Sequence, residues 1–492
     1  MTAEAAGPGN PGRPVQSADV VVVGGGLAGL ALARRLADRH PGRVLVIESG
    51  PDAGRDHYRW VNDAGTADAL WLEPTADPHF WQPYLPTDSG YRGIAGLRRR
   101  LGGRSLYWGG VAVPIEPWAL DSGAWPSSVV HDLTASWRGG PSLYESVAAD
   151  VRRWAGDRVP PAEPPLLLAG REFTEAPRAV REAADGRWQA YSPLDDWPEG
   201  VEIRCDSHAV AVIVHEGEAT GVLVERNGER QVINASRVVL AAGTVENSRL
   251  VLQALREVDE GASPQVIGLA DKLAQGFAAS FDPAAVPPSL RRLAESGRLF
   301  LSRADGELRS SLFLQGRTNA HGMVIVDCYC MGEQLPGPAG RVWCEPGTRL
   351  PWPTFVAGGL SSVDERLVQD QRRALTHLHE ELCREAGWTV GPLGFEDPFG
   401  SPDLADRLSA GDAMTAPGRT STYAFPIGSE QHEAGTLPLG GPLLDEHARV
   451  RAVGGVYVTG PAVFPRTGAA NPALTILALA TRLADQLAAA EA

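Results

Sequence analysis

The sequence predicts an α/β plus α+β protein, with one domain that binds a dinucleotide and a second domain built on a mixed sheet. Three observations predict this class. A strand–turn–helix–strand unit with a glycine-rich turn lies near the N-terminus. Further strands that end in glycine turns recur in the middle of the chain and near its C-terminus. The 492 residues also exceed what one hydrophobic core usually holds, so two domains are expected.

The N-terminal unit predicts a Rossmann-like dinucleotide site. A strand of four valines leads into a G-x-G-x-x-G turn, and a segment with helical spacing follows. In such a turn Gly24 makes the tight bend, Gly26 lets the backbone approach a pyrophosphate, and Gly29 lets the helix pack against the strand. Glu48 ends the next strand about 20 residues further on, where a carboxylate can accept hydrogen bonds from a ribose. The alternative, a glycine-rich loop in an ordinary sheet, gives Glu48 no role.

The chain is expected to return to this domain several times. Residues 102–110 contain four glycines and a serine, and such a loop can lie flat against a flat ligand. A strand, a glycine turn and a helix are predicted over residues 237–252. We expect a disordered tail at 1–18, the nucleotide-binding domain at 19–156, 201–270 and 441–492, and the second domain at 157–200 and 271–440.

The last strand leads to a loop and a helix that together suit a cofactor ring. It ends at Gly460, and Asn471 lies in the loop that follows. Pro472 then opens an Ala/Leu-rich segment, and proline suits a first helical position because no N–H is needed there. The amides and positive dipole end at a helix start attract electron-rich or anionic groups. Asn471 is therefore expected beside both a cofactor and a substrate oxygen.

One histidine lies close in sequence to this last strand. His432 precedes a Gly-Thr turn by three residues, in a predicted loop. Histidine is the natural base near neutral pH because its unperturbed pKa is about 6.5. Taken alone, a loop histidine is more often simply solvated, and Asn471 alone would be read as a turn residue. Their role therefore depends on the motifs around them.

Composition limits the partners. The net charge of −15 argues against nucleic acid and anionic membranes, which require basic patches. No stretch approaches the ~20 apolar residues of a membrane span, so we expect a cytoplasmic protein. The five cysteines form no C-x-x-C pair and are expected to be buried free thiols. His377 and His379 would face different ways on a helix, so no metal site is expected. Lys272 is the only lysine, which we attribute to codon usage.

Five segments, in this order along the chain, together resemble the glucose–methanol–choline (GMC) flavoprotein oxidoreductases. They are residues 24–29, 102–110, 240–250, 432–436 and 468–475. One such segment is weak support, whereas five in order are specific. Residues 103–110 are most similar to the bacterial pyranose-oxidase-like branch. The resemblance implies a Rossmann-like FAD-binding domain with a mixed-sheet substrate-binding domain over the flavin, in the GMC or p-hydroxybenzoate-hydroxylase-like architecture.

The resemblance also implies which residues contact FAD. The glycine turn would face the pyrophosphate, Glu48 the ribose, and the backbone of Val210 the adenine. The Pro472 helix start would face N1 and the C2 carbonyl of the flavin, where a positive dipole favours reduction. The full expected set is Gly24, Gly26, Leu27, Ala28, Gly29, Glu48, Ser49, Gly102, Gly103, Ser105, Trp108, Gly109, Gly110, Val210, Ala242, Gly243, Gly460, Pro461, Asn471, Pro472 and Thr475.

His432 and Asn471 match the catalytic pair of the family. The implied reaction oxidises H–C–OH to C=O, with His432 as the base, Asn471 bonded to the same oxygen, and hydride transfer to flavin N5. General-base help of this kind is worth about 10²–10⁴-fold. The expected substrate is a small hydroxyl compound: a sugar, a glycoside or a natural-product intermediate. Because the base must be neutral, flavin reduction is expected to rise with pH through the histidine titration.

Two departures from the family pattern have consequences. Tyr107 occupies the position where the pyranose oxidase branch often links FAD through a histidine, so we predict non-covalent FAD. The chain is short for the family, and no histidine occurs at 268–272, so the substrate domain is expected to be trimmed.

Two alternatives on the same scaffold are a non-redox lyase similar to hydroxynitrile lyases and a flavin-binding protein without turnover. The hydroxyl compound, the electron acceptor (oxygen, a quinone or a carrier) and the oligomeric state are left open by the sequence.

Overall fold

A five-stranded parallel sheet carries the glycine-rich turn near the N-terminus. Its strand order is β11 (Glu202–Arg204), β3 (Val44–Ile47), β2 (Val20–Val23), β15 (Arg237–Leu240) and β24 (Val456–Val458). Neighbouring strands are parallel throughout. The four valines of β2 are at most 3% exposed, as expected of a central parallel strand covered on both faces. Strands from distant parts of the chain therefore meet in one sheet, in the way that repeated returns to one domain require.

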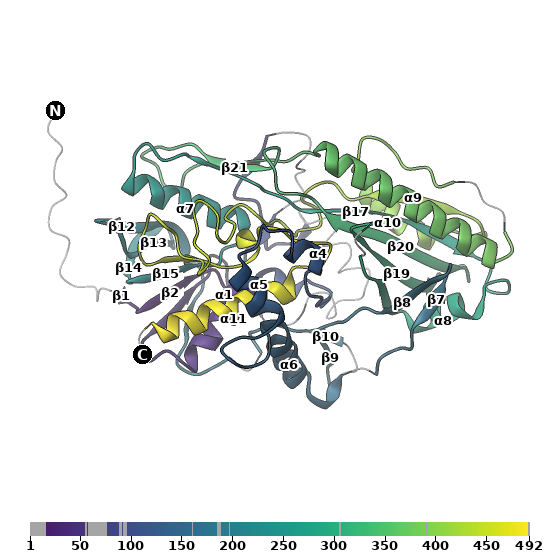
Figure 1. The fold of residues 1–492 in the computed structure, drawn as a ribbon, viewed down its shortest axis with the longest axis horizontal. Helices are drawn as coiled ribbons and strands as arrows, with labels where there is room; N and C mark the ends of the chain where they lie inside the picture. Colours follow the sequence, from purple (N-terminus) through teal and green to yellow (C-terminus); the bar gives the residue numbers. More distant parts are fainter. Residues whose placement is uncertain are drawn as a thin grey trace.

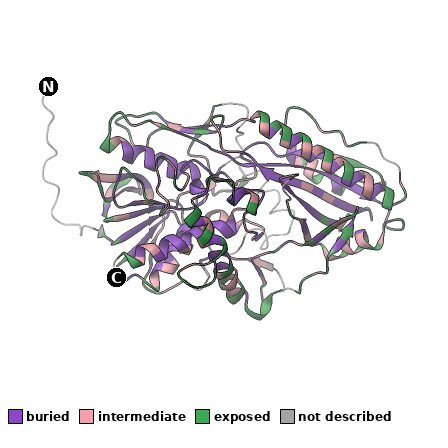
Figure 2. Cartoon of the chain, in the orientation of Figure 1, coloured by how far each residue is buried: buried purple, intermediate pink, exposed green. Residues whose placement is uncertain are grey.

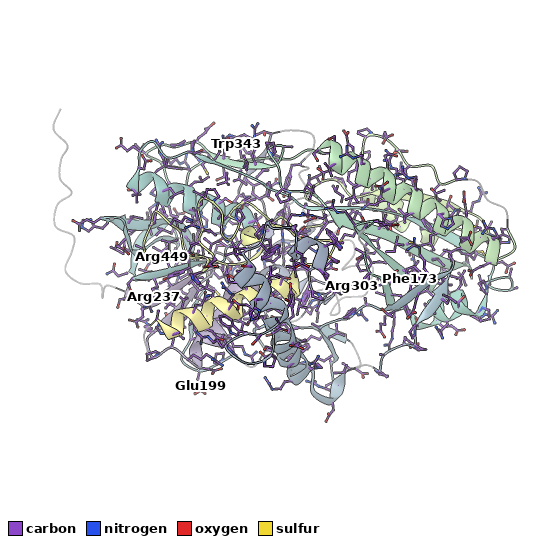
Figure 3. The ribbon with its side chains drawn as sticks, in the orientation of Figure 1. Phe173, Glu199, Arg237, Arg303, Trp343 and Arg449 are labelled. Atoms are coloured by element: carbon purple, nitrogen blue, oxygen red, sulfur yellow. The ribbon has the colours of Figure 1, made fainter. Side chains whose placement is uncertain are left out.

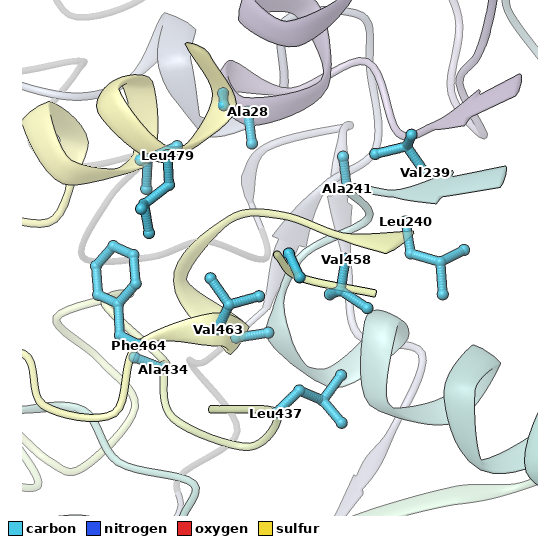
Figure 4. Packing of buried hydrophobic residues seen from close by; sticks show 14 of the residues in the cluster. Ala28, Val239, Leu240, Ala241, Ala434, Leu437, Val458, Val463, Phe464 and Leu479 are labelled. Carbon is cyan, nitrogen blue, oxygen red and sulfur yellow. The ribbon is translucent and has the colours of Figure 1, made fainter. Parts of the chain in front are cut away.

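The structure is a computed structural model, and it describes residues 16–490 except 55–56, 58–75, 88–90, 92–95, 160, 185–187, 196, 305–306 and 389–391. Helix α1 (Leu27–Ala37) follows the glycine turn and lies beside α11 (Ala473–Ala489), so the first and last helices are neighbours (Figure 1). Ala28 of α1 and Leu479 of α11 lie in one apolar core with Val463 and Phe464 (Figure 4).

A four-stranded sheet flanks the parallel sheet. Its order is β1 (Gln16–Ser17), β14 (Glu229–Asn234), β13 (Glu218–Arg226) and β12 (His208–His215). The predicted disordered tail is wrong for residues 16–18: β1 pairs in parallel with β14, and the Ala18 amide donates to the Asn234 carbonyl over 3.0 Å. Residues 1–15 lie outside the described residues.

A seven-stranded sheet forms the other part of the molecule. Its order is β23 (Thr420–Ala424), β17 (Lys272–Phe281), β20 (Val324–Glu333), β19 (Ser310–Thr318), β18 (Leu299–Ser302), β8 (Arg171–Glu175) and β7 (Leu166–Leu168). Helix α9 (Ser362–Glu385) packs on β17 and β20, with one side buried and the other exposed (Figure 2). The strands of this sheet come from the ranges assigned to the second domain, and the domain boundaries themselves stay a prediction.

The remaining elements connect the sheets. The helices are α4 (Pro117–Leu120), α5 (Ser127–Thr134), α6 (Leu143–Ala155), α7 (Thr244–Val258), α8 (Pro288–Ser296) and α10 (Leu404–Ser409). The short strands are β4 (Phe80–Trp81), β5 (Leu85–Pro86), β6 (Leu97–Arg98), β9 (Val180–Glu182), β10 (Trp188–Ala190), β16 (Gln265–Ile267), β21 (Arg341–Cys344) and β22 (Thr354–Ala357). Four 3₁₀ turns complete the described elements, at Gly103–Leu106, Gly156–Arg158, Ala410–Ala413 and Pro461–Val463.

Arg303 ties the two parts together. It lies just after β18, toward the side of α4 (Figure 3), and donates to the Pro114 carbonyl over 2.8 Å. Its guanidinium also lies 3.8 Å from the Glu116 carboxylate at the start of α4.

Three expectations from composition can be compared with the fold. All five cysteines are free thiols, and all but Cys205 are buried. Among the described helices, none is both long enough and apolar enough to cross a membrane. His379 is buried on α9 whereas His377 is exposed, and the described residues contain no group of three potential metal ligands.

Candidate active site

The glycine turn is built by backbone packing. A side chain at Gly29 would place its Cβ 2.0 Å from the Gly24 carbonyl oxygen, and one at Gly24 would lie 2.5 Å from the Ala241 oxygen. Gly24 also has φ +110°, a conformation that L side chains rarely adopt. A Cβ at Gly26, by contrast, would meet no atom within 4 Å. Gly26 is also the N-cap of α1, and no side chain caps it, so the helix start faces open space that suits a pyrophosphate.

Glu48 supports this turn directly. One carboxylate oxygen accepts the Gly25 amide over 2.8 Å, and the other accepts the Gly50 amide over 2.8 Å and the Ser49 hydroxyl over 3.2 Å. Burial raises the pKa of the Glu48 carboxyl, and these two amides oppose that effect. Each carboxylate oxygen has further acceptor capacity, so Glu48 can hold the turn and still accept a ribose hydroxyl.

Two side chains of α7 that the sequence reasoning missed hold backbone segments that are predicted to contact FAD. Arg249, 2% exposed, donates to the Val210 carbonyl over 2.8 Å and to the Ala209 carbonyl over 2.9 Å. A bulge takes Val210 out of register with β13, so the chain there is anchored by Arg249 instead. Glu246, one helical turn earlier, pairs with Arg249 at 2.7 Å. That i, i+3 pair of opposite charges was the available sequence signal.

The second missed residue is Asn247. Its carboxamide oxygen accepts the Ala242 amide over 2.8 Å, and its amide nitrogen donates to the Thr459 carbonyl over 3.0 Å. It therefore joins the ends of β15 and β24, where Gly243 and Gly460 both have positive φ. A Cβ on Gly460 would meet only Ala28, at 3.7 Å, so the backbone is open to a ligand there.

The loop at 102–110 lies directly against the glycine turn. The Gly102 amide donates to the Gly25 carbonyl over 2.8 Å, and Gly102 has φ +90°. The Ser105 hydroxyl donates to the Gly102 carbonyl over 2.6 Å, and the Trp108 indole donates to the Tyr191 carbonyl over 3.0 Å. These two side chains use their polar groups within the protein, so a flavin would meet the loop through its backbone and ring edges.

The same loop supplies the residue that fixes His432, and the sequence reasoning missed it. Arg104 donates to the Gln431 carbonyl over 2.8 Å. Its two terminal guanidinium nitrogens also bind the two oxygens of the buried Glu433 carboxylate, one of them over 2.8 Å. It therefore binds the residues that precede and follow His432 in the chain. The His432 amide is in turn bound by Asp271 over 2.9 Å. Arg104 is the single arginine within the glycine-rich loop, and a charge in such a loop was the signal to follow.

The imidazole of His432 has an unusually low pKa. Burial, and then the nearby cations Lys272 and Arg104, lower its pKa to about 3. Its Nδ1 is buried and has no hydrogen-bond partner in the described protein. A pKa this low favours the neutral form of the ring. The expected rise in rate through a histidine titration near pH 6.5 is displaced to much more acidic solution.

The carboxamide of Asn471 also presents an unsatisfied atom, because its buried oxygen has no partner in the described protein. The backbone before it is firmly held. Glu333 accepts the Thr467 and Gly468 amides over 2.9 and 3.0 Å, and Glu116 accepts the Ala469 amide over 2.9 Å.

The chain just after His432 runs beside the chain just after β24. The Gly435 amide donates to the Pro461 carbonyl over 3.2 Å, and the Leu437 amide donates to the Ala462 carbonyl over 2.8 Å.

The final helix differs slightly from expectation. Pro472 is the N-cap of α11 and not its first residue, with φ −75° and ψ −16°. The hydroxyl of Thr475, in the first turn, forms a 2.9 Å hydrogen bond with the Tyr144 hydroxyl, so it is committed inside the protein.

Family models match three segments of the chain. One described as GMC oxidoreductase matches residues 395–480, and one described as FAD binding domain matches residues 190–306. A third, described as lycopene cyclase protein, matches residues 19–85.

Similar proteins extend the match to nearly the whole chain. The 5-(hydroxymethyl)furfural oxidase of Methylovorus sp. (strain MP688) is 24% identical and covers 95% of this chain and 98% of its own. An oxygen-dependent choline dehydrogenase of Rhizobium rhizogenes is 28% identical over 52% of this chain and 50% of its own. The crystal structure of pyridoxine 4-oxidase from Mesorbium loti has a TM-score of 0.63 at 19% identity, covering 95% of this chain and 98% of its own.

The fold and these matches together define an FAD-dependent oxidoreductase. The predicted resemblance to the GMC oxidoreductases is confirmed, and so are the predicted fold class and the predicted cofactor, FAD. The assignment to the pyranose-oxidase-like branch and the non-covalent attachment of FAD stay predictions.

Proposed function

We propose that this protein oxidises the hydroxyl group of a small molecule, with His432 as the base and Asn471 as the group that holds the substrate oxygen. The observation that carries the proposal is a pair of buried, unsatisfied atoms, Nδ1 of His432 and the carboxamide oxygen of Asn471. Two adjacent residues link the loops that carry them, because Asp271 binds the His432 amide and Lys272 binds the Gly468 carbonyl. Leaving buried polar atoms without hydrogen bonds costs folding free energy, so their presence on these loops indicates a ligand.

The chain's own residues prepare the site for proton removal. A neutral His432 imidazole can accept the hydroxyl proton, and Asn471 can fix the oxygen while that proton leaves. FAD, when bound, supplies the hydride acceptor at N5. Arg104 orients the base by gripping Gln431 and Glu433 on its two sides. The named relatives act on 5-(hydroxymethyl)furfural, choline and pyridoxine, and this supports a small alcohol as the substrate class here.

A flavin-bleaching screen tests this proposal. Under anaerobic conditions we expect at least one of 5-(hydroxymethyl)furfural, choline, pyridoxine, a sugar panel or a glycoside panel to reduce the bound FAD. A His432→Ala variant should reduce it about 10²–10⁴-fold more slowly. His321→Ala, an exposed histidine in a remote hairpin turn, is the matched control and should behave as wild type.

Two results would remove the assignment. One is a His432→Ala variant that reduces its flavin as fast as wild type. The other is cyanohydrin cleavage by wild type while the flavin stays yellow, which would favour a lyase. The same preparations test the attachment of FAD, because acid precipitation should leave a dissociable flavin in the supernatant, in keeping with Tyr107 at the linkage position.

A further inference from the structure

Lys272 occupies a place that codon usage does not explain. It is the only lysine in the chain, it is the first residue of β17, and it is 1% exposed. Its ammonium group donates to the Gly468 carbonyl over 2.5 Å and to the Thr467 carbonyl over 3.2 Å. Burying an ammonium is expensive unless partners replace its water. Scarcity of lysine accounts for the missing surface lysines but not for the burial of this one.

Asp271, the residue before Lys272, binds the loop that carries His432. It is 1% exposed, and its carboxylate accepts the His432 amide over 2.9 Å. Just before it, Ala270 exchanges two backbone hydrogen bonds with Ala434, at 3.1 and 2.9 Å. Residues 270–272 therefore contact both loops. Ala270 and Asp271 bind the loop that carries His432 (the histidine loop, residues 430–435). Lys272 binds the loop that carries Asn471 (the asparagine loop, residues 466–472). Asp271 lies just before β17 and Lys272 is the first residue of that strand, so two adjacent side chains serve the two loops.

We propose that Asp271 and Lys272 are a pair of positioning residues that sets the spacing between His432 and Asn471. This inference rests on the proposed function, because the spacing has catalytic meaning only if both groups address one substrate oxygen. A general base must approach its proton donor to within about 2.6–3.2 Å. A displacement of about 1 Å in such a site can cost about 10²-fold in rate.

The charges around Lys272 give the pair a pH dependence. Burial lowers the pKa of Lys272 to about 8. The negative charges of four carboxylates oppose this and raise the pKa: Glu333, Glu116, Asp271 and Glu430. Glu333 is itself paired with Arg466 and Arg309. A neutral amine can still donate to the two carbonyls, but it no longer offsets the negative charges of Glu333 and Glu116. We therefore expect the asparagine loop to loosen above about pH 8.

A single lysine makes the charge state directly measurable. Holoenzyme labelled with [¹³Cε]lysine should give one lysine signal, and its titration midpoint should lie near pH 8 instead of about 10.4. A midpoint at the ordinary value would overturn the buried, loop-bound placement of the amine.

Hydrogen exchange separates the two halves of the pair. In holoenzyme, Lys272→Met should raise amide exchange about tenfold or more in residues 466–472, because the Thr467 and Gly468 carbonyls lose their buried donor. Asp271→Ala should do the same in residues 430–435. Arg317→Met, at a remote ion pair with Asp327, is the matched control and should change neither segment. Exchange that rises equally in both segments in each variant, or in neither, would overturn the proposal.

Activity then tests positioning against general stability. With whichever alcohol bleaches the wild-type flavin, Lys272→Met should slow flavin reduction about 10²-fold with little change in KM, and Lys272→Arg should recover part of the loss. Equal rates in Lys272→Met and wild type would overturn the proposal. If no alcohol bleaches the wild-type flavin, the proposed function fails, while the exchange experiment still decides whether the pair holds the two loops. Where Lys272→Met does not fold, Lys272→Arg and Asp271→Asn supply the same comparisons.

Discussion

The two ends of the proposed cofactor site are held in different ways. At the nucleotide end, the glycine turn is shaped by backbone contacts so close that a single methyl group would collide with a carbonyl. At the catalytic end, the loops of His432 and Asn471 are held by buried charged side chains from other parts of the chain: Arg104, Asp271, Lys272, Glu333 and Glu116. The first end leaves no room for a side chain at Gly24 or Gly29, whereas the second depends on buried charges that stay paired.

This difference has a practical meaning. The close backbone contacts of the glycine turn do not depend on pH, although the buried Glu48 and Arg249 add charged contacts around it. A network of buried ions depends on each member keeping its partner, because removing one charge leaves another unpaired. We therefore expect mutations at the nucleotide end to act through cofactor retention, and mutations at the catalytic end to act through rate and pH.

The largest effect should come from adding one methyl group to the turn. Gly29→Ala places a Cβ 2.0 Å from the Gly24 carbonyl oxygen, so we expect protein that fails to retain FAD or to fold. Gly26→Ala is the matched control, because its Cβ meets no protein atom within 4 Å. It should fold normally yet bind FAD at least about tenfold more weakly, since the methyl group enters the space for the pyrophosphate. Flavin absorbance per protein and thermal unfolding measure both; equal FAD content in the two variants would contradict the comparison.

A smaller effect should follow from replacing Arg104, which binds the residues on both sides of His432. Arg104→Met leaves the buried Glu433 carboxylate without its cation, a change that typically costs about 3–5 kcal/mol. We expect FAD to remain bound and flavin reduction by a substrate alcohol to fall about 10²-fold. Arg104→Lys keeps the charge but cannot form the two-pronged contact, so it should recover only part of the rate. A full rate in Arg104→Met, measured by anaerobic stopped flow, would show that the base needs no such support.

The smallest effect concerns acid. A histidine with a pKa of about 6.5 would lower the rate of flavin reduction about 30-fold between pH 8 and pH 5. Because the pKa of His432 is lowered to about 3, the base stays neutral over this range, and we expect a change below about threefold. Rapid-mixing measurements at constant ionic strength decide this. A steep acid limb near pH 6.5 would mean that the imidazole is far better solvated than the fold indicates.

The contrast also explains which features could be predicted from the sequence. The turn at Gly24 to Gly29 and the carboxylate of Glu48 follow from short-range spacing, and the fold class followed from them. The family match brought His432 and Asn471 to attention through the segments around them.

The supports at the catalytic end could not be predicted in this way. Arg104 and Glu433 are 329 residues apart, and Lys272 and Gly468 are 196 apart, so only the folded chain brings them together. The pairing of β1 was missed for the same reason, since a two-residue strand has no detectable periodicity and owes its place to Asn234.

The burial of Lys272 has a consequence for handling the protein. With its only ε-amino group sealed in the interior, reagents and resins that attack primary amines meet no side chain of this kind on the outside. Coupling of this type can use at most the α-amino group of the chain, which would give attachment at one point and one orientation on an electrode or bead.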